Sequence, residues 1–537
     1  YGIMTEYILG LEGYSTTLKQ AKEEHLSGSG AAGFLNLEDY ALEGVSVIGD
    51  YQYRVILKGK YPQFLYWLAM PFFAPTAIEV DQFYSQPGMK EKNLTLDWYP
   101  VGTGPYMLTV NNPNRQMILE KNPNFHGEVY PSEGEAIDRQ NGLLKDAGNA
   151  LPQISKVIYS LEKEAIPIWN KFLQGYYDAS GIGSDSYDQA VQIGSTGDIG
   201  LTETMQEKGI RLSTAVESSI FYTGFNMLDP VVGGFSEKNR LLRQAIGIAV
   251  DYEEYIAIFA NGRGIPAQGP IPPGIFGHGE GDKATNPYIY DAGESDPKRK
   301  SIVFARDLLA KAGYPNGRSL SDGKPLTLNL DTTGTGPDDK ARLDWIRKQF
   351  AKLDIQLIIR GTDYNRFQDK MNKGTAQIFQ WGWNADYPDP ENFLFLLYGK
   401  NGKVEYKGEN AANYSNDKFD ALFETMKNME NGPERQVIID RMVEQLRFDS
   451  PWLFGFHPKK FSLFHSWYSN VKPNLMANNT LKYKRLDATK RQAMRQAWNK
   501  PIIWPIAGIL LLLLLIILPA FIAYKRHETS REGILEP

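Results

Sequence analysis

The sequence contains no cysteine. This absence excludes disulfide bonds, thiolate metal sites, a cysteine nucleophile and a lipid-modified cysteine anchor within the chain, and it is compatible with any cellular compartment. Histidine is scarce, with 6 residues in 537, and no two of them have the i, i+4 or His-Glu-x-x-His spacing typical of a zinc site. We therefore expect neither a metal nor a cofactor.

Motifs for catalysis and for nucleic-acid binding are missing as well. The chain has no Gly-x-Ser-x-Gly nucleophile elbow. Asp386 and Asp389 are close enough in sequence to suggest a glycosidase pair, but they share one loop, whereas catalytic carboxylates usually face each other from separate elements. The net charge of −5 and the lack of a long basic stripe argue against nucleic acid. We expect a protein that is not an enzyme.

The length of 537 residues is too great for one ordinary core and predicts two or three lobes. The composition is that of a globular protein that is rich in aromatic residues, with 30 tyrosines and 10 tryptophans. These side chains can fill a core or give ligands a rigid amphipathic contact surface. The sequence starts at Tyr1 and no apolar leader follows, so we expect that the true N-terminus and any signal peptide are missing.

One long apolar run, from Ile502 to Tyr524, is present. As a helix it reaches about 34 Å, which is enough to cross a bilayer core. Trp504 and Tyr524 lie at its ends, where an aromatic belt is expected. Basic residues flank both ends, so local charge does not determine the orientation. The preceding basic helix, 487–500, has two open interpretations, a helix on anionic headgroups or a solvated spacer.

Hydrophobic periodicity between residues 326 and 380 predicts an alternation of strands and helices. The expected strands are Leu326–Asp331, Ile355–Arg360 and Gln377–Gln380, and the expected helices are Asp338–Leu353 and Asn365–Asn372. Such βαβ order indicates a mostly parallel sheet covered by helices. Outside this region we expect a strand from Ile220 to Asn226, one helix over Lys238–Phe259 and an aromatic strand pair over Pro451–Leu463.

The stretch from Trp381 to Pro390 follows the last of these strands. Its glycine, asparagine and prolines predict that the strand ends at Gln380 and that a loop begins. Ligands often bind at the carboxyl ends of strands in open α/β sheets. Two interpretations stay open from this stretch alone, a binding mouth and a Trp-rich turn that plugs the edge of a core.

The motif Gly382-Trp-Asn-Ala-Asp-Tyr-Pro-Asp-Pro390 resembles extracellular solute-binding protein family 5, the peptide- and nickel-binding receptors of ABC importers. Further blocks are similar to those of the family and fall in its order. They are Val101–Tyr106, Leu119–Asn124, Phe225–Asn226, Leu242–Asp251, Gly269–Gly274 and Ala305–Tyr314. The resemblance covers roughly residues 50 to 475.

This resemblance implies an α/β protein with the two-lobed periplasmic-binding-protein fold, an extra small domain and, in this chain, a C-terminal transmembrane helix. The implied divisions are 1–128 as the remainder of the extra domain, 129–151 as a polar surface excursion, 150–228 with 462–487 as one lobe, 229–461 as the other, 487–500 as a basic juxtamembrane helix, 502–524 as the span and 525–537 as a short tail.

The family also implies the ligand-binding residues. In peptide-binding relatives the aspartate matching Asp386 takes the α-ammonium of the peptide, and the residue matching Asn384 assists through its backbone. Aromatic side chains at Trp383 and Tyr364 are expected to pack on the ligand, and Tyr222 is a further candidate. Gln380 stands where an oligopeptide receptor carries an arginine for the peptide carboxylate, so this chain departs from the pattern there.

The leading hypothesis is a membrane-anchored receptor that captures peptides, or a related small solute, by hinge closure and delivers them to an ABC permease. It would be a single-pass protein of the bacterial inner membrane, with the large domain in the periplasm, a short cytoplasmic tail and lipid contacts along 502–524. The alternative is a structural or regulatory subunit of another membrane complex that keeps the fold without the ligand, with 128–151 and 487–499 as partner surfaces.

Overall fold

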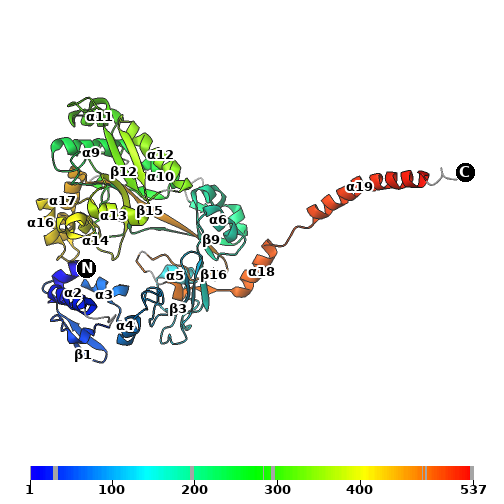
Figure 1. Cartoon of the computed structure of the whole chain (residues 1–537), viewed down its shortest axis with the longest axis horizontal. Coiled ribbons are helices and arrows are strands. Elements are labelled where there is room, and N and C mark those ends of the chain that lie inside the picture. Colours follow the sequence, from blue (N-terminus) through cyan, green and yellow to red (C-terminus); the bar gives the residue numbers. More distant parts are fainter. Residues whose placement is uncertain are drawn as a thin grey trace.

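The computed structural model of the chain describes residues 2–27, 34–193, 199–281, 284–291, 297–334, 336–474, 476–477 and 480–531. The end of the expected tail, 532–537, lies outside these residues. Two groups of helices and strands share a long strand, β15, a third group lies beside them, and α18 leads to the C-terminal helix α19, which extends away from the rest (Figure 1).

A mixed sheet forms the centre of the largest group. Its strand order is β11-β15-β10-β14-β12-β13. The bounds are Gly264–Pro266 for β11, Trp452–His465 for β15, Ser219–Phe225 for β10, Ile378–Asn384 for β14, Thr327–Thr332 for β12 and Gln356–Gly361 for β13. Strand β12 is parallel to both β13 and β14, as the βαβ alternation predicts, whereas β10 is antiparallel to both of its neighbours.

Strand β15 is shared by two of these groups of elements. Its first half pairs with β10 and β11, and its second half, from Lys459 to His465, pairs with β9. The expectation of a strand pair over 451–463 is therefore wrong, because the chain stays extended through Pro458. The proline lies where the neighbouring strand changes, and its missing N–H interrupts no continuous ladder there.

Helices cover both faces of the central sheet and enclose two apolar cores. On one side lie α9 (Glu237–Ala249), α10 (Tyr252–Phe259), α11 (Ile302–Lys311) and α12 (Pro337–Ala351); on the other lie α13 (Tyr364–Lys373), α14 (Glu391–Leu394), α15 (Lys403–Tyr406), α16 (Asp417–Met426) and α17 (Pro433–Asp449). The single helix expected over 238–259 is two helices. The side chain of Asp251 accepts a hydrogen bond from the N–H of Glu254 and starts α10 as an N-cap.

The second group surrounds the far half of β15. It contains α6 (Ala165–Leu173), β6 (Ala179–Gly181), α7 (Tyr187–Ala190), β7 (Val191–Ile193), β8 (Ile199–Leu201), α8 (Glu203–Glu207) and β9 (Ile210–Val216). Strands β6 and β9 both pair with β15. Buried Trp169, Phe172 and Leu463 lie in its separate core. We call this group the second lobe, and the group around β10 and β14 the first lobe.

The third group contains the N-terminal part of the chain. Its elements are α1 (Gly2–Tyr7), α2 (Leu11–Ser27), β1 (Val45–Gly49), β2 (Gln52–Val55), α3 (Phe64–Leu68) and α4 (Ile78–Tyr84). A three-stranded sheet follows, with β3 (Tyr106–Asn112), β4 (Gln116–Lys121) and β5 (Lys156–Ser160), together with α5 (Ala136–Gln140), β16 (Tyr468–Ser469) and β17 (Arg485–Leu486). Asp146 binds Asn470 and Arg485, so the segment before β5 is tied to the returning chain.

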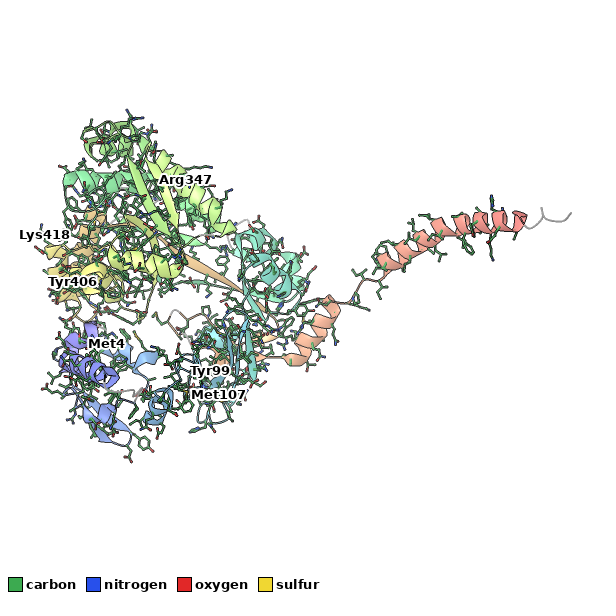
Figure 2. All side chains as sticks on the ribbon, viewed as in Figure 1. Met4, Tyr99, Met107, Arg347, Tyr406 and Lys418 are labelled. Atoms are coloured by element: carbon green, nitrogen blue, oxygen red, sulfur yellow. The ribbon has the colours of Figure 1, made fainter. Side chains whose placement is uncertain are left out.

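Two helices complete the chain, α18 (Ala488–Trp498) and α19 (Trp504–Arg531). Within α19, Trp504–Thr529 is long and apolar enough to cross a membrane, and it makes the expected 502–524 segment a candidate span. Side chains project from all sides of α19 without touching the rest of the chain (Figure 2).

Candidate functional site

Strand β14 continues past Gln380 and ends at Asn384, so the expected strand end is wrong by four residues. The reason is its pairing with β10, in which Ser219 lies opposite Asn384 and Phe221 opposite Gly382. A Cβ atom on Gly382 would come within 2.7 Å of the Phe221 ring. The glycine thus lets an aromatic ring lie across the strand rather than ending it.

The stretch from Trp381 to Glu391 divides in two shortly after the end of β14. We call Trp381–Asp386 the outer segment, because its residues are partly or fully exposed, and Tyr387–Glu391 the inner segment, because it is mostly buried. The interpretation as a binding site is therefore compatible with the outer segment, and the interpretation as a turn that fills the edge of a core is compatible with the inner segment.

A buried amide, Asn392, organises the outer segment. Its Oδ1 atom accepts hydrogen bonds from the indole Nε1 of Trp383 at 3.1 Å and from the backbone N–H of Asp386 at 2.7 Å. Its Nδ2 donates to the carboxylate of Asp386 at 3.3 Å. One side chain thus fixes both a ring and a carboxylate that the sequence predicts to bind ligand. Asn392 itself was not predicted, and its only signal in the sequence is an amide six residues after Asp386.

The Asp386 carboxylate has an unfavourable environment for its charge. It keeps contact with solvent, but surrounding protein atoms partly desolvate it and raise its pKa, and the nearby Glu409 carboxylate raises the pKa further. The hydrogen bond from Asn392 acts in the opposite direction. Among the residues that the structure describes, no Lys or Arg forms an ion pair with Asp386. A cationic ligand group would relieve this situation.

Three other predicted residues, Tyr222, Tyr364 and Gln380, line one pocket of about 600 Å³. The rest of its wall is rich in aromatic side chains from β10, β14, β15 and α10, with Asp339 and Arg342 of α12 as its charged members. Such a wall, mostly apolar with few polar groups, is typical of small-molecule sites.

The position of this pocket follows from the strand register. Strands β12 and β14 pair only at Leu330 with Ile378 and at Asp331 with Phe379. After this point they separate, and the chain following β12 and the start of α13 border the opening. The pocket therefore lies at the carboxyl ends of two parallel strands, as the sequence predicts for a ligand site.

Individual side chains differ in how free they are to bind a ligand. Tyr222 is buried and stacks on Trp452, with ring centroids 3.6 Å apart. Tyr364 is 56% exposed and accepts a hydrogen bond from Gln368. Asn384 is exposed, and its Oδ1 accepts a hydrogen bond from the Ser219 hydroxyl at 2.7 Å. Tyr364 and Asn384 present reachable polar groups, whereas Tyr222 contributes mainly to the wall.

The inner segment is used inside the protein. Asp389 forms a bidentate ion pair with Arg435, at 2.7 and 2.8 Å, and both side chains are buried. Glu391 is fully buried and accepts hydrogen bonds from the hydroxyls of Tyr61 and Tyr387. Burial raises the pKa of Glu391 to about 8. This segment joins the N-terminal group to the first lobe, a junction at which Met4 lies in Figure 2.

Metal binding has no support in the described residues, which contain no cluster of three or more His, Asp or Glu side chains able to hold an ion. His278 and His457 lie near each other, with ring centroids 6.0 Å apart, but each is bound to a backbone carbonyl through Nδ1.

Comparison with known proteins identifies the family. The profile of the bacterial extracellular solute-binding proteins, family 5, matches residues 14–405. The chain belongs to this family. Membership confirms the resemblance inferred from the Gly382–Pro390 motif, and it confirms that the chain is a binding protein rather than an enzyme.

Two curated relatives illustrate the similarity. The chain is 24% identical over 434 residues to heme-binding protein A of Haemophilus influenzae, an alignment that covers 78% of this chain and 65% of that relative. It is 25% identical over 465 residues to di/tripeptide-binding protein 2 of Pseudomonas aeruginosa, covering 86% and 75% of the two chains.

Solved structures agree on the fold. The DppA protein of Helicobacter pylori, determined with the peptide STSA, matches with a TM-score of 0.62 at 20% identity, covering 83% of this chain and 74% of that one. The dipeptide-binding protein of Pseudoalteromonas sp. SM9913, determined with Met-Leu, matches with a TM-score of 0.62 at 18% identity, covering 82% and 75%. The expected α/β binding-protein fold is confirmed.

Proposed function

We propose that the chain is a membrane-anchored receptor that captures peptides with a free amino terminus and delivers them to an ABC importer. The observation that carries this proposal is the Asp386 carboxylate, which is partly desolvated, held by Asn392 and unpaired with any cation in the described chain. A peptide ammonium is the complementary group, because it forms a charge-assisted hydrogen bond and lowers the raised pKa of Asp386.

The length of β14 is suited to an extended ligand. Gln380 lies in the pocket wall, and Asp386, the last residue of the outer segment, lies two residues past the end of β14. The four residue steps of strand from Gln380 to Asn384 span about 13 Å. A short peptide with its ammonium at Asp386 would thus place its following side chains in the aromatic pocket, where Tyr364 and Trp381 accept varied shapes.

Membrane attachment and location are parts of the same proposal. We place α19 across the bacterial inner membrane, the folded lobes in the periplasm and the residues after the span in the cytoplasm. The apolar length of Trp504–Thr529 and its lack of contact with the lobes support the span. A tether raises the concentration of a receptor near its permease without any new contact.

The alternative of a structural subunit has less support. It uses 128–151 and 487–499 as partner surfaces, but both segments contact the chain itself. Lys482 pairs with Glu128, Arg485 with Asp146, and Arg491 with Asp178. The receptor accounts for these segments without an additional subunit.

Titration calorimetry on the detergent-purified full chain tests the receptor function. We expect a library of di- to tetrapeptides to contain ligands that bind, and N-acetylation of the same peptides to abolish binding. Hemin serves as a second titrant because one relative is named as a heme-binding protein. Equal binding of free and acetylated peptides, or binding of hemin alone, would contradict the proposal.

A further inference from the structure

Helix α18 is attached to the second lobe by one face. Arg491, Met494, Arg495 and Trp498 are half-buried, and they have the i, i+3, i+4, i+7 spacing of a single helical stripe. The remaining residues of α18 are exposed. The stripe therefore packs on protein, and only the opposite face, which carries Lys490, is free. A solvated spacer does not describe this arrangement, and only the free face of the helix is available to anionic headgroups.

Polar contacts fix the helix at its first turns. Arg491 Nη1 pairs with Asp178 Oδ2 at 3.0 Å, and Asp178 also accepts a hydrogen bond from the indole of Trp467 at 2.8 Å. The backbone N–H of Asp487, the N-cap, donates to the carbonyl of Trp467 at 2.9 Å. Asp178 and Trp467 of the second lobe thus fix the position of the first turns of α18.

Aromatic stacking continues this attachment into the core of the second lobe. Phe172 stacks on His465 at 4.3 Å between ring centroids, and His465 stacks on Trp467 at 4.1 Å. Trp498 lies 5.4 Å from both His465 and Trp467. Because His465 is the last residue of β15, the strand shared by both lobes ends against the helix that leads to the candidate span.

Cations close the far end of the contact. Lys208 lies over the Trp498 ring at 4.5 Å, and Arg495 lies over the Tyr176 ring at 4.5 Å. Lys208, just after α8, thus covers the Trp498 ring of the stripe, and Arg495 of the stripe covers Tyr176, so removing Trp498 would open the contact between the end of α8 and α18.

The link from α18 to α19 is short and stiff. Asn499 donates a hydrogen bond to the carbonyl of Gln174 at 2.9 Å, and α19 begins at Trp504. A chain of this length spans about 18 Å at most. Pro501 restricts the backbone of Lys500 to extended conformations. The surface of the second lobe around Gln174 is thereby kept within a short distance of the span.

The two lobes are connected by few crossings. Strand β9 ends at Val216 and β10 begins at Ser219, while β15 changes partner near Pro458. All contacts of α18 described above lie on the second-lobe side of these crossings. Bending at them would move the first lobe, with Asp386, and leave the position of α18 on the second lobe unchanged.

We propose that α18 mounts the second lobe on the bilayer in one fixed orientation, with the surface around Gln174 and Trp498 facing the lipid headgroups, so that the first lobe is the one that moves relative to the membrane. Exposed Lys490 and Lys500 suit an anionic headgroup layer. The inference rests on the proposed membrane anchor, but it does not depend on which ligand the receptor binds.

Paired spin labels test the mount. The chain has no cysteine, so Glu203→Cys in α8 and Gln492→Cys on the free face of α18 give a labelled pair without background. In full-length protein in nanodiscs of phosphatidylcholine and phosphatidylglycerol we expect one narrow distance distribution. Adding Arg491→Ala and Trp498→Ala should broaden it at least twofold, whereas the matched control Gln496→Ala, on the exposed face, should not. A broad distribution in the parent, or no change in the double variant, overturns the mount.

Energy transfer to a lipid-borne acceptor tests the orientation. A fluorophore at Glu203→Cys should transfer strongly and one at Lys418→Cys, in the first lobe far from α19 in Figure 2, weakly. Peptide addition should change only the second signal. Flotation and calorimetry on the same samples separate the failures. A chain that floats and binds peptide but shows equal transfer at both positions overturns this inference alone, and a chain that does not float overturns it together with the anchor.

Discussion

Asp386 and Asp389 lie three residues apart in one stretch of chain, yet their surroundings are opposite. Asp389 is buried and has both of its oxygens bound by Arg435. Asp386 is reached by solvent, has no cationic partner among the described residues and has a raised pKa. The residue type is the same, so the partner makes the difference. A carboxylate supplied with a cation by its own fold stabilises the fold, and one left without a cation is available to a ligand.

The same contrast extends to the outer and inner segments as a whole. In the outer segment, Asn392 holds Trp383 and Asp386, which we propose as ligand-binding residues. The inner segment joins Glu391 to Tyr61 of the N-terminal group. Substitutions in the outer segment should therefore affect ligand binding, and substitutions in the inner segment should affect the stability of the fold.

The largest effect is expected in the inner segment. Arg435→Ala leaves Asp389 buried without its partner and should destabilise the protein by roughly 3–5 kcal/mol. Thermal unfolding of the full chain in detergent, with and without the substitution, measures the loss. Arg441→Ala, at an exposed position of the same helix α17, is the control and should have little effect. Equal destabilisation by the two variants would contradict the role assigned to the ion pair.

In the outer segment the main effect should be on affinity. Asp386→Asn keeps the hydrogen-bonding shape but removes the charge, and it should weaken binding of free-amine peptides by about 1.5–3 kcal/mol, roughly ten- to hundredfold. The unfolding temperature should stay within a few degrees of the parent. Parent affinity should fall as the pH is lowered through the raised pKa of Asp386, and the variant should lack this dependence. Unchanged calorimetric affinity in the variant would remove Asp386 from the site.

The buried acid of the inner segment predicts a pH dependence of stability. Burial raises the pKa of Glu391 from its ordinary value of 4.5 to about 8 in the folded chain. Between these values the folded state holds a proton that the unfolded state has lost, so stability falls as the pH rises, by about 1.4 kcal/mol per unit at most. Glu391→Gln should remove this part of the slope while keeping an acceptor for Tyr61. Unfolding profiles from pH 5 to 8 that run parallel in parent and variant would contradict it.

The extent of the fold was predictable where the hydrophobic period is clear. The βαβ alternation that places the pocket follows from the period-2 and period-3.6 patterns between residues 326 and 380. The ends of elements depended on tertiary pairing. Gly382 suggested a loop, but β10 supplies the Phe221 ring that keeps the strand intact. A strand pair was expected over 451–463, but this stretch lies within one strand, β15, whose partner changes near Pro458.

The candidate site was predictable only in part. Asp386 and Trp383 are carried by a recognisable motif, whereas Asn392 reaches them through the turn into α14, which no local pattern encodes. The division of the stretch into an outer and an inner segment was not predictable from the sequence either. The residues that bury the inner segment, Arg435 and Tyr61, come from distant parts of the chain.

The smallest effect is expected at the far end of the pocket. Gln380 offers an uncharged amide there, and Arg342 of α12 is exposed, so its charge is screened by water. C-terminal amidation of a bound peptide should therefore change its affinity by less than about threefold, whereas N-acetylation should abolish binding. Calorimetry with the four combinations of free and blocked ends measures both. A much larger loss of affinity on amidation would contradict this expectation, and Arg342→Ala would then test the cause. If amidation has no effect in that variant, Arg342 binds the peptide carboxylate, and both ends of the ligand are recognised by charge.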